Sequence, residues 1–310
     1  MKRKALLLLA LVLMLTLVAC AKDQPVDVET SETMEVAEVS YPLTIKDGQG
    51  QDITIDKEPE RVISLAPSVT ETIFAIGAGE KVVGRTDYCT YPAEVESIPS
   101  VGTILEPDVE AILALEPDLI IAQSIFLEET LEQFNQAGIP VLSIQDPNNL
   151  EELYAGISTI GQATAHVKEA QAVLTNMQTK ISEVHKAIEG VEPKSVYYAV
   201  SFGEYGDFTA TGDTFIHEVL TQAGATNAAE EGVNWAFDRE QLIAKDPDVV
   251  IVADENDNVN AFSSDPAYSV LKAVENGQVI AVDKNLLEIP GPRIGDAVET
   301  IAKILYPDKF

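Results

Sequence analysis

Hydrophobic residues recur at intervals of three or four between residues 164 and 190, a spacing that lays one apolar stripe along a helix. No proline or glycine interrupts this stretch before Gly190, and Pro193 follows as a stop signal. Thr164 is suited to cap the first turn. The pattern therefore predicts one long helix over residues 164–190, roughly 35–40 Å long at 1.5 Å per residue.

Short apolar runs alternate with helix-period segments on both sides of this helix. An earlier stretch, from Tyr41 through the Asp47-Gly48 pair, alternates apolar and polar residues as a β-hairpin does. Strands that alternate with helices favour parallel sheets covered by helices on both faces. The expected fold is α/β, with an N-terminal lobe (residues 41–163) and a C-terminal lobe (residues 191–310) joined by the one long rigid helix. The expected sheet strands are 61–65, 82–84, 119–122 and 141–144 before the helix, and 195–200, 249–252 and 279–282 after it.

The two lobes resemble each other in sequence. ILALEPDLIIA (112–122) is similar to LIAKDPDVVIV (242–252), which indicates two related units with a cleft between them. Ligands of open α/β sheets lie beyond the carboxyl ends of the strands, and domain interfaces favour such sites. Alternatively, the helix lies on the surface of one domain or forms half of a coiled coil. The loops expected to line the cleft are 66–68, 85–92, 123–127, 201–210, 232–237 and 284–293.

The first twenty residues are typical of an exported lipoprotein. A basic start and an apolar run end in Leu17-Val18-Ala19-Cys20, which resembles a bacterial lipobox. We expect residues 1–19 to be a signal peptide, Cys20 to be lipidated, and residues 20–40 to form an acidic tether on the outer face of the cytoplasmic membrane. A transmembrane anchor is the alternative. Cys89 then has no intramolecular partner, so the protein is expected to fold without disulfides.

Charge and motif content exclude several function classes. The formal net charge is −31, which argues against nucleic acid or anionic lipid as the main partner. The sequence holds no G-x-S-x-G, H-E-x-x-H or Gly-rich phosphate loop, and its three histidines are isolated. We therefore expect no catalytic residues, no resident metal and no intrinsic cofactor.

Aromatic residues gather in the loops expected at the cleft. Such rings suit a large, flat, partly apolar ligand, although each ring could instead anchor its loop to its own lobe. Arg85 and Arg293 are candidates to meet an anionic group, Glu288 is a candidate acceptor at the rim, and Arg239 is more consistent with an ion pair. The candidate ligand-binding aromatics are Tyr88, Tyr91, Phe126, Tyr205, Phe208, Trp235 and Phe237.

Glu71 and Glu218 occupy equivalent places early in the first helix of each lobe. Each precedes a glycine by six residues, Gly77 and Gly224 respectively. Acids near a helix start commonly complement the helix dipole. Their pairing suggests, in addition, two exposed acids presented to a two-fold partner.

The chain resembles the helical-backbone solute-binding lipoproteins of ABC importers, which take up cobalamin, haem and ferric siderophores. The resemblance covers about residues 43–308 and is closest to the cobalamin-binding branch. It implies a monomeric receptor, not an enzyme, that carries a corrinoid to an ABC permease dimer and its ATPase. The alternative ligand is haem or a ferric siderophore. A remote alternative function is that of a cell-surface enzyme or adhesin. It further implies ligand contacts at Tyr88, Trp235 and Glu288, and permease docking at Glu71 and Glu218. The stretches that carry it are the lipobox, ISLAPSVTETIFAIGAGEKVVGRTDYCTYP, ILALEPDLIIA, the long helix, TGDTFIHEVLTQAG, NWAFDREQLIAKDPDVVIV and PGPR.

Overall fold

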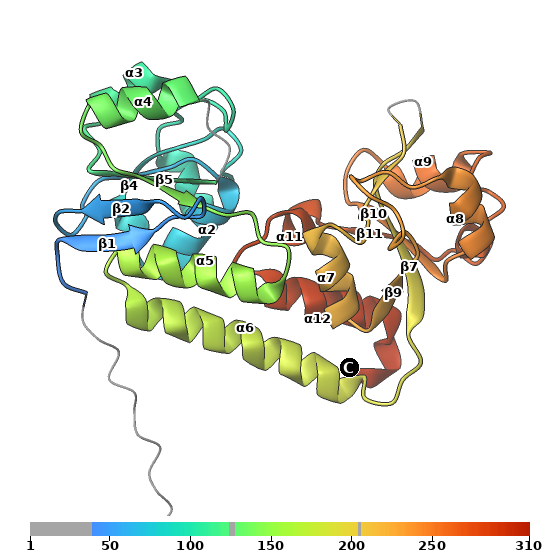
Figure 1. The fold of residues 1–310 in the computed structure, drawn as a ribbon. Coiled ribbons are helices and arrows are strands. Elements are labelled where there is room, and N and C mark those ends of the chain that lie inside the picture. The colour runs from blue at the N-terminus through green and yellow to red at the C-terminus, as the bar shows by residue number, and fades with distance from the viewer. Residues whose placement is uncertain (1–38, 124–127, 204–205) are drawn as a thin grey trace, which may run out of the picture. The chain divides into compact units, whose positions relative to one another are not determined.

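The N-terminal lobe is built on a four-stranded parallel sheet in the order β4-β3-β5-β6 (Figure 1). This computed structural model describes residues 39–310 except 124–127 and 204–205, so Cys20, Phe126 and Tyr205 lie outside the described residues. An antiparallel hairpin precedes the sheet, as its alternating pattern predicts. The elements are β1 (Leu43–Lys46), β2 (Asp52–Ile55), β3 (Val62–Ser64), α2 (Pro67–Ala75), β4 (Val82–Arg85), α3 (Val109–Ala114), β5 (Leu119–Gln123), α4 (Glu128–Gln136), β6 (Val141–Ile144) and α5 (Leu150–Ala163).

Successive residues of the central strand β5 face two different hydrophobic clusters. Leu119 and Ile121 join the cluster that includes α2 and α5, whereas Ile120 packs with Phe134 of α4. Both faces of the sheet are therefore covered, which explains why the strand reads as an unbroken apolar run.

The C-terminal lobe repeats this plan with a five-stranded sheet. The path β11-β10-β7-β8 holds three parallel strands and an antiparallel edge strand β8, and β9 pairs with β7 in parallel. The expectation of mainly parallel sheets flanked by helices is confirmed. The elements are β7 (Lys194–Ser201), β8 (Phe208–Thr209), α7 (Phe215–Gln222), β9 (Ala225–Asn227), α8 (Arg239–Lys245), β10 (Val249–Ala253), α9 (Asn258–Ser264), α10 (Lys272–Glu275), β11 (Val279–Val282), α11 (Lys284–Glu288) and α12 (Ile294–Leu305).

The long helix between the lobes, α6, spans Val167–Ala187, about 30 Å, and is shorter than expected at both ends. Thr164 does not cap its start. Instead Thr164 ends α5, where its backbone N–H and its hydroxyl both donate to the Ile160 carbonyl. Ala165, with φ of 62°, reverses the chain before α6 begins.

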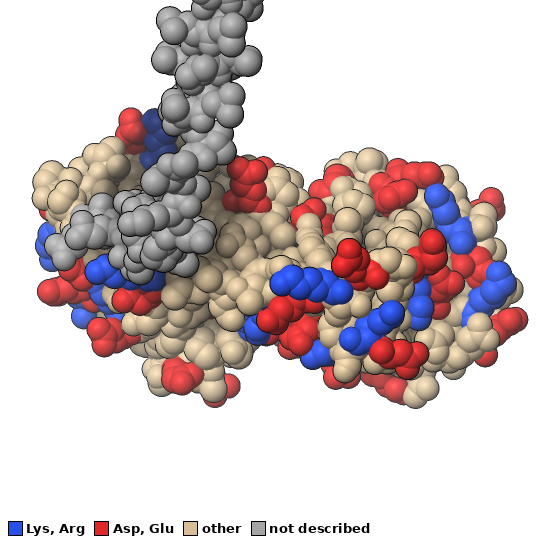
Figure 2. Space-filling view, turned by 90° about the horizontal axis from the view of Figure 1, so that it is seen from below, with Lys and Arg blue, Asp and Glu red and all other residues tan. Residues whose placement is uncertain are grey.

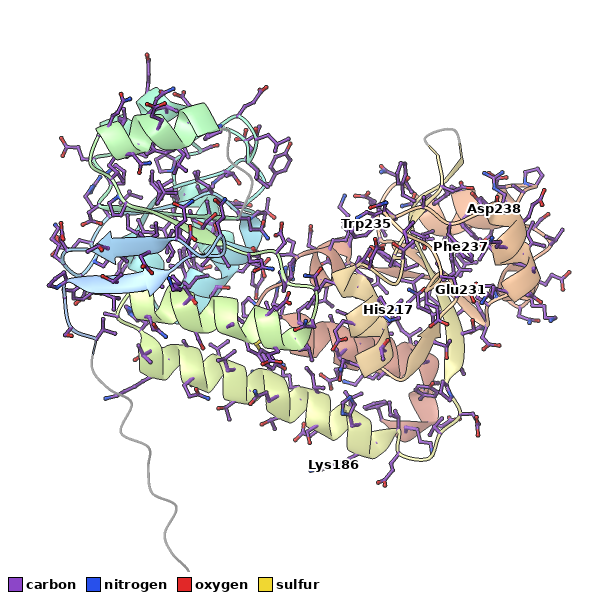
Figure 3. The ribbon with its side chains drawn as sticks, in the orientation of Figure 1. Lys186, His217, Glu231, Trp235, Phe237 and Asp238 are labelled. Atoms are coloured by element: carbon purple, nitrogen blue, oxygen red, sulfur yellow. The ribbon has the colours of Figure 1, made fainter. Side chains whose placement is uncertain are left out.

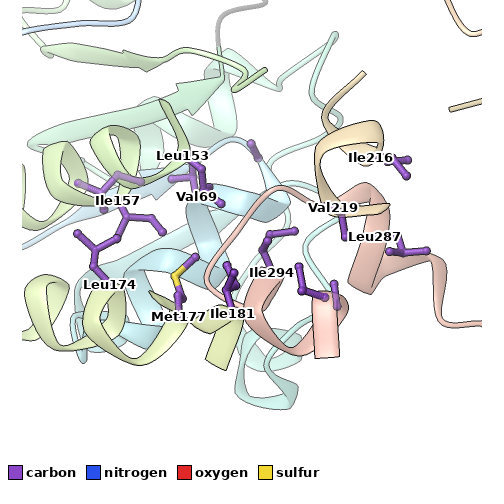
Figure 4. Close-up of a cluster of buried hydrophobic side chains, with 14 of the residues drawn as sticks. Val69, Leu153, Ile157, Leu174, Met177, Ile181, Ile216, Val219, Leu287 and Ile294 are labelled. Atoms are coloured by element: carbon purple, nitrogen blue, oxygen red, sulfur yellow. The ribbon is translucent and has the colours of Figure 1, made fainter. Parts of the chain in front are cut away.

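Helix α6 connects the two lobes, but it does not stand alone between them. It packs against α5 on one side and α12 on the other. Ala170, Met177, Ile181 and Val184 of the apolar stripe are buried. They belong to one hydrophobic cluster that also includes Leu174 and, from α12, Ile294 (Figure 4). Three helices therefore join the two sheets through a continuous core.

Charged side chains of both signs are interspersed on the face shown in Figure 2. The described part of this face presents no broad basic surface of the kind that binds nucleic acid. Within the described part of the chain, no helix combines the length and the apolarity needed to cross a membrane.

Candidate functional site

A cavity of about 410 Å³ is lined by residues of both lobes. From the N-terminal lobe, most of the wall lies at the carboxyl ends of parallel strands: the segments after β3 and β6, and Gln123 at the end of β5. Ile104, from the segment between β4 and α3, completes it. From the C-terminal lobe, they come from the start of α7, the loop before α8, and the end of α11 with the residues after it. The lining residues are Pro67, Ser68, Ile104, Gln123, Asp146, Pro147, Asn148, Asp213, Thr214, Phe215, Ile216, Trp235, Leu287, Glu288, Ile289 and Pro290.

Two of the candidate ligand-binding residues, Trp235 and Glu288, line this cavity. Trp235 keeps 40 % of its surface exposed, and its position is labelled in Figure 3. The Tyr198 hydroxyl, from a fully buried side chain, donates to Oε1 of Glu288 over 2.7 Å. Burial raises the pKa of Glu288, and the Tyr198 hydrogen bond opposes that rise only in part. The carboxyl group of Glu288 is thereby held in place at the cavity wall.

Three other candidate aromatics do not line the cavity. Tyr88, Tyr91 and Phe208 are exposed at 58 %, 48 % and 47 %. Phe237 is 8 % exposed and belongs to the core cluster of the C-terminal lobe, so the expectation that it contacts a ligand was wrong. Its ring anchors the loop that carries Trp235, which is the alternative that the sequence left open.

Glu71 and Arg293 bind each other, which overturns two expectations. Glu71 was expected to be exposed, but its side chain is 2 % exposed, and Arg293 was expected to meet a ligand. Nε and Nη2 of Arg293 donate to the two carboxylate oxygens over 2.7 and 2.6 Å. The Arg293 guanidinium also lies 4.3 Å from the centre of the Tyr91 ring. The Glu71 side chain points toward the C-terminal lobe. The spacing of residues along α2 does not predict which side of the helix meets that lobe.

The symmetry expected between Glu71 and Glu218 is therefore incomplete. Glu218 lies half-buried on α7, where its Oε1 accepts a hydrogen bond from Gln222 over 2.9 Å. It has no ion-pair partner among the described residues. Of the two acids, only Glu218 retains the accessibility that docking requires.

The other charged candidates, and Cys89, interact with neighbouring groups of the protein. Arg85 is half-buried outside the cavity, and its Nη1 donates to the Thr86 carbonyl over 3.0 Å. Arg239 forms an ion pair with Asp207, as expected. Cys89 is buried and accepts a hydrogen bond from Thr70 over 3.0 Å. Among the described residues no group of three His, Cys, Asp or Glu side chains is placed to hold a metal ion.

The sequence missed the segments at 146–148 and 213–216. The first follows β6, so the rule of carboxyl strand ends would have identified it. The second spans the start of α7, and the sequence offered no signal for it beyond its similarity to the start of α2. These segments add Asp146 and Asp213 to Glu288, whereas the described lining contains no lysine or arginine. Burial raises the pKa of Asp146.

Comparisons with known proteins agree with this architecture. The family model of the periplasmic binding proteins matches residues 62–286. An uncharacterized ABC transporter substrate-binding lipoprotein of Bacillus subtilis, YvrC, is 34 % identical over 100 % of this chain and 99 % of its own length. A cobalamin-binding protein of Halobacterium salinarum is 30 % identical over 86 % of this chain and 75 % of its own. The apo structure of the periplasmic haem-binding protein RhuT of Roseiflexus sp. RS-1 superposes with a TM-score of 0.73, at 29 % identity, over 81 % of this chain and 99 % of its own.

Proposed function

We propose that this chain, which belongs to the periplasmic binding protein family and is the substrate-binding component of an ABC transporter, binds a corrinoid in the cavity between its lobes. As in its relatives, the role is solute binding and not catalysis, and it implies a permease and an ATPase as partners. The corrinoid, not haem or a ferric siderophore, is the specific ligand we infer.

The charge of the cavity wall carries the proposal. Three carboxyl groups, of Asp146, Asp213 and Glu288, line it together with the amides of Gln123 and Asn148. A corrin ring bears primary amides at its edge, which donate hydrogen bonds to carboxylates and amide carbonyls. Haem bears propionates, and catecholate siderophores are anionic, so both would meet like charges at this wall, whose described lining contains no lysine or arginine.

The shape and apolar content of the cavity suit part of such a ligand. Its volume lies within the roughly 300–1,000 Å³ usual for small-molecule sites, and Trp235 offers the face of a large ring. A corrinoid is larger than this cavity and would therefore bind with part of its edge exposed. The cobalamin-binding relative supports the same ligand class.

Delivery to the permease is the second part of the proposal. Cys20 is the inferred lipid attachment site, with residues 1–19 removed and residues 20–40 acting as a tether between the membrane and the two lobes, 41–163 and 191–310. Glu218 is the acid we propose for docking, since it remains accessible. The expected working form is a monomer on the outer face of the cytoplasmic membrane.

Titration of the purified protein with cyanocobalamin, haemin and a ferric hydroxamate tests the ligand. Quenching of the single tryptophan and the melting temperature report binding. At a corrinoid concentration about 100-fold above Kd, stabilisation is about 2.7 kcal/mol, which raises Tm by roughly 5–10 °C. A comparable or larger rise with haemin, and none with cyanocobalamin, would replace the corrinoid by haem. No rise with any of the three would refute the entire ligand class.

A further inference from the structure

Trp235 occupies the second central position of a tight turn. The turn runs over Val233–Ala236 and is closed by a 3.1 Å hydrogen bond from Ala236 N–H to the Val233 carbonyl. Both central residues have positive φ, 54° at Asn234 and 64° at Trp235. Turns with two such residues favour asparagine followed by glycine. A tryptophan in the glycine position is strained, and strain of this kind is retained where the surrounding structure enforces it.

The enforcing contacts come from one short neighbouring segment. The Thr211 hydroxyl accepts a hydrogen bond from Trp235 N–H over 3.2 Å, and Asp213 Oδ2 accepts one from Asn234 N–H over 2.9 Å. The Thr211 hydroxyl in turn donates to Asp213 Oδ1. On the opposite side, Thr209 N–H donates to the Trp235 carbonyl over 2.9 Å. The amides of both strained residues are thus bound by two side chains that also bind each other.

The arrangement depends on which group donates and which group accepts each hydrogen bond. The Thr211 hydroxyl can accept from Trp235 because its own hydrogen is directed to Asp213. The Asn234 N–H and the Thr211 hydroxyl lower the pKa of Asp213, so its carboxylate remains ionised and accepts both bonds at neutral pH. The Thr211 methyl group packs tightly, since a Cβ added to Gly232 would lie 2.5 Å from Thr211 Cγ2.

We propose that Thr211 and Asp213 are positioning residues that hold Trp235 in a strained backbone conformation and so present its indole, preformed, to the ligand cavity. The inference rests on the proposed function, because it assigns Trp235 the role of a ligand platform. We call Thr211 and Asp213 the clamp. Asp213 and Trp235 both line the cavity, so part of the clamp and the ring that it holds belong to the same wall. A ring that is already placed binds without the cost of ordering it.

The matched variants Thr211→Val and Thr211→Ser test the clamp in the ligand-free protein. Valine keeps the shape but removes the hydroxyl, whereas serine keeps the hydroxyl and loses only the methyl group. Trp235 is the only tryptophan, so its emission reports this site alone. We expect lower anisotropy and about twofold greater acrylamide quenching in Thr211→Val, as a larger share of the turns opens, with Thr211→Ser close to wild type. Asp213→Asn should change the emission in the same direction as Thr211→Val but less, because the amide nitrogen cannot accept from the Thr211 hydroxyl, whereas that hydroxyl can still accept from Trp235 N–H.

Affinity for cyanocobalamin supplies the second readout. We expect about tenfold weaker binding in Thr211→Val and wild-type binding in Thr211→Ser. Unchanged anisotropy and quenching in both Thr211→Val and Asp213→Asn would overturn the clamp, whatever the ligand. If the emission changes as expected but no protein, wild type included, binds the corrinoid, the clamp stands and the proposed ligand fails. Equal loss in Thr211→Val and Thr211→Ser would assign the effect to the methyl group and also overturn the proposal.

Discussion

The carboxylate of Glu71 and the guanidinium of Arg293 form a two-pronged ion pair between the lobes, with donor–acceptor distances of 2.6 and 2.7 Å. Glu71 lies on α2 beside the N-terminal sheet, and Arg293 is the N-cap residue immediately before α12. Tyr91 lies against the guanidinium, 4.3 Å from ring centre to Cζ. Together with the α5–α6–α12 core, this pair ties the lobes on the side of Pro290, which lines the cavity. We therefore predict that the lobes close only slightly on ligand binding.

Removing one partner of this ion pair should lower the free energy of unfolding far more than removing one partner of an exposed ion pair. Arg293→Met leaves the Glu71 carboxylate buried without its cation, and we expect a loss of about 3 kcal/mol in the free energy of unfolding. Glu71→Gln combined with Arg293→Met should lose less than the sum of the two single changes. Urea unfolding of the four proteins measures this coupling.

Lys303→Met on the same helix is the matched control. Lys303 and Glu299 form an exposed i,i+4 pair, which is worth only about 0.3–0.5 kcal/mol. Equal losses for Arg293→Met and Lys303→Met would show that the inter-lobe pair contributes nothing specific to stability.

The close contact of α5 and α6 predicts that a better helix former will destabilise the protein. A Cβ at Gly161 would lie 2.5 Å from the Ala170 Cβ and 3.2 Å from the His166 carbonyl oxygen. Alanine in place of glycine gains up to about 1 kcal/mol of helix propensity, whereas overpacking costs about 1–3 kcal/mol. We expect Gly161→Ala to lower Tm. In Gly156→Ala the nearest atom is a side-chain methyl of Ile144 at 3.2 Å, so the same change should be milder there. A higher Tm for Gly161→Ala would contradict this packing.

Two substitutions of Trp235 separate backbone strain from the loss of the ring. Trp235→Gly and Trp235→Ala both remove the indole, but only glycine adopts a φ of 64° without strain. The glycine variant should therefore be more stable than the alanine variant by about 1 kcal/mol, a difference of roughly 2–4 °C in Tm. Both should bind corrinoid poorly. Equal melting temperatures would show that the turn is relaxed and that its conformation needs no enforcement.

Glu288 should give the protein a pH dependence of known sign. Its pKa in the folded state is raised, so the folded protein binds this proton more tightly than the unfolded chain does. The associated stability is fully present below the usual pKa of 4.5 and is lost as the pH rises through the raised value. The Tm of Glu288→Gln relative to wild type should therefore increase between about pH 4 and pH 7.

Glu152→Gln provides a control of opposite sign. Hydrogen bonds from the Asn148 backbone and side chain lower the pKa of Glu152, so its contribution is present above the usual value and is lost as the pH falls. The Tm of this variant relative to wild type should decrease as the pH rises toward about 5 and then stay level. If the difference in Tm between Glu288→Gln and wild type did not change with pH, the Glu288 carboxyl group of the wild type would not be shielded from water.

The local patterns predicted the elements, whereas the errors have both local and long-range causes. Unbroken apolar runs such as 119–122 identified the parallel strands, and the three-to-four spacing identified α6. Thr164 was misassigned because it can end one helix as well as start the next, and the reversal at Ala165 decides between them. Trp235 and Phe237 look alike in sequence, yet Trp235 lines the cavity and Phe237 belongs to the core, because Trp235 lies within the tight turn and Phe237 follows it. The burial of Glu71 depends on a partner 222 residues away.

Equilibrium dialysis of the protein against equal concentrations of cyanocobalamin and haemin tests the charge selectivity of the cavity most directly. Three carboxyl groups and no lysine or arginine line its described wall, so we expect the protein compartment to acquire the corrinoid absorption bands and no Soret band. Retention of haemin in preference to cyanocobalamin would contradict the corrinoid assignment.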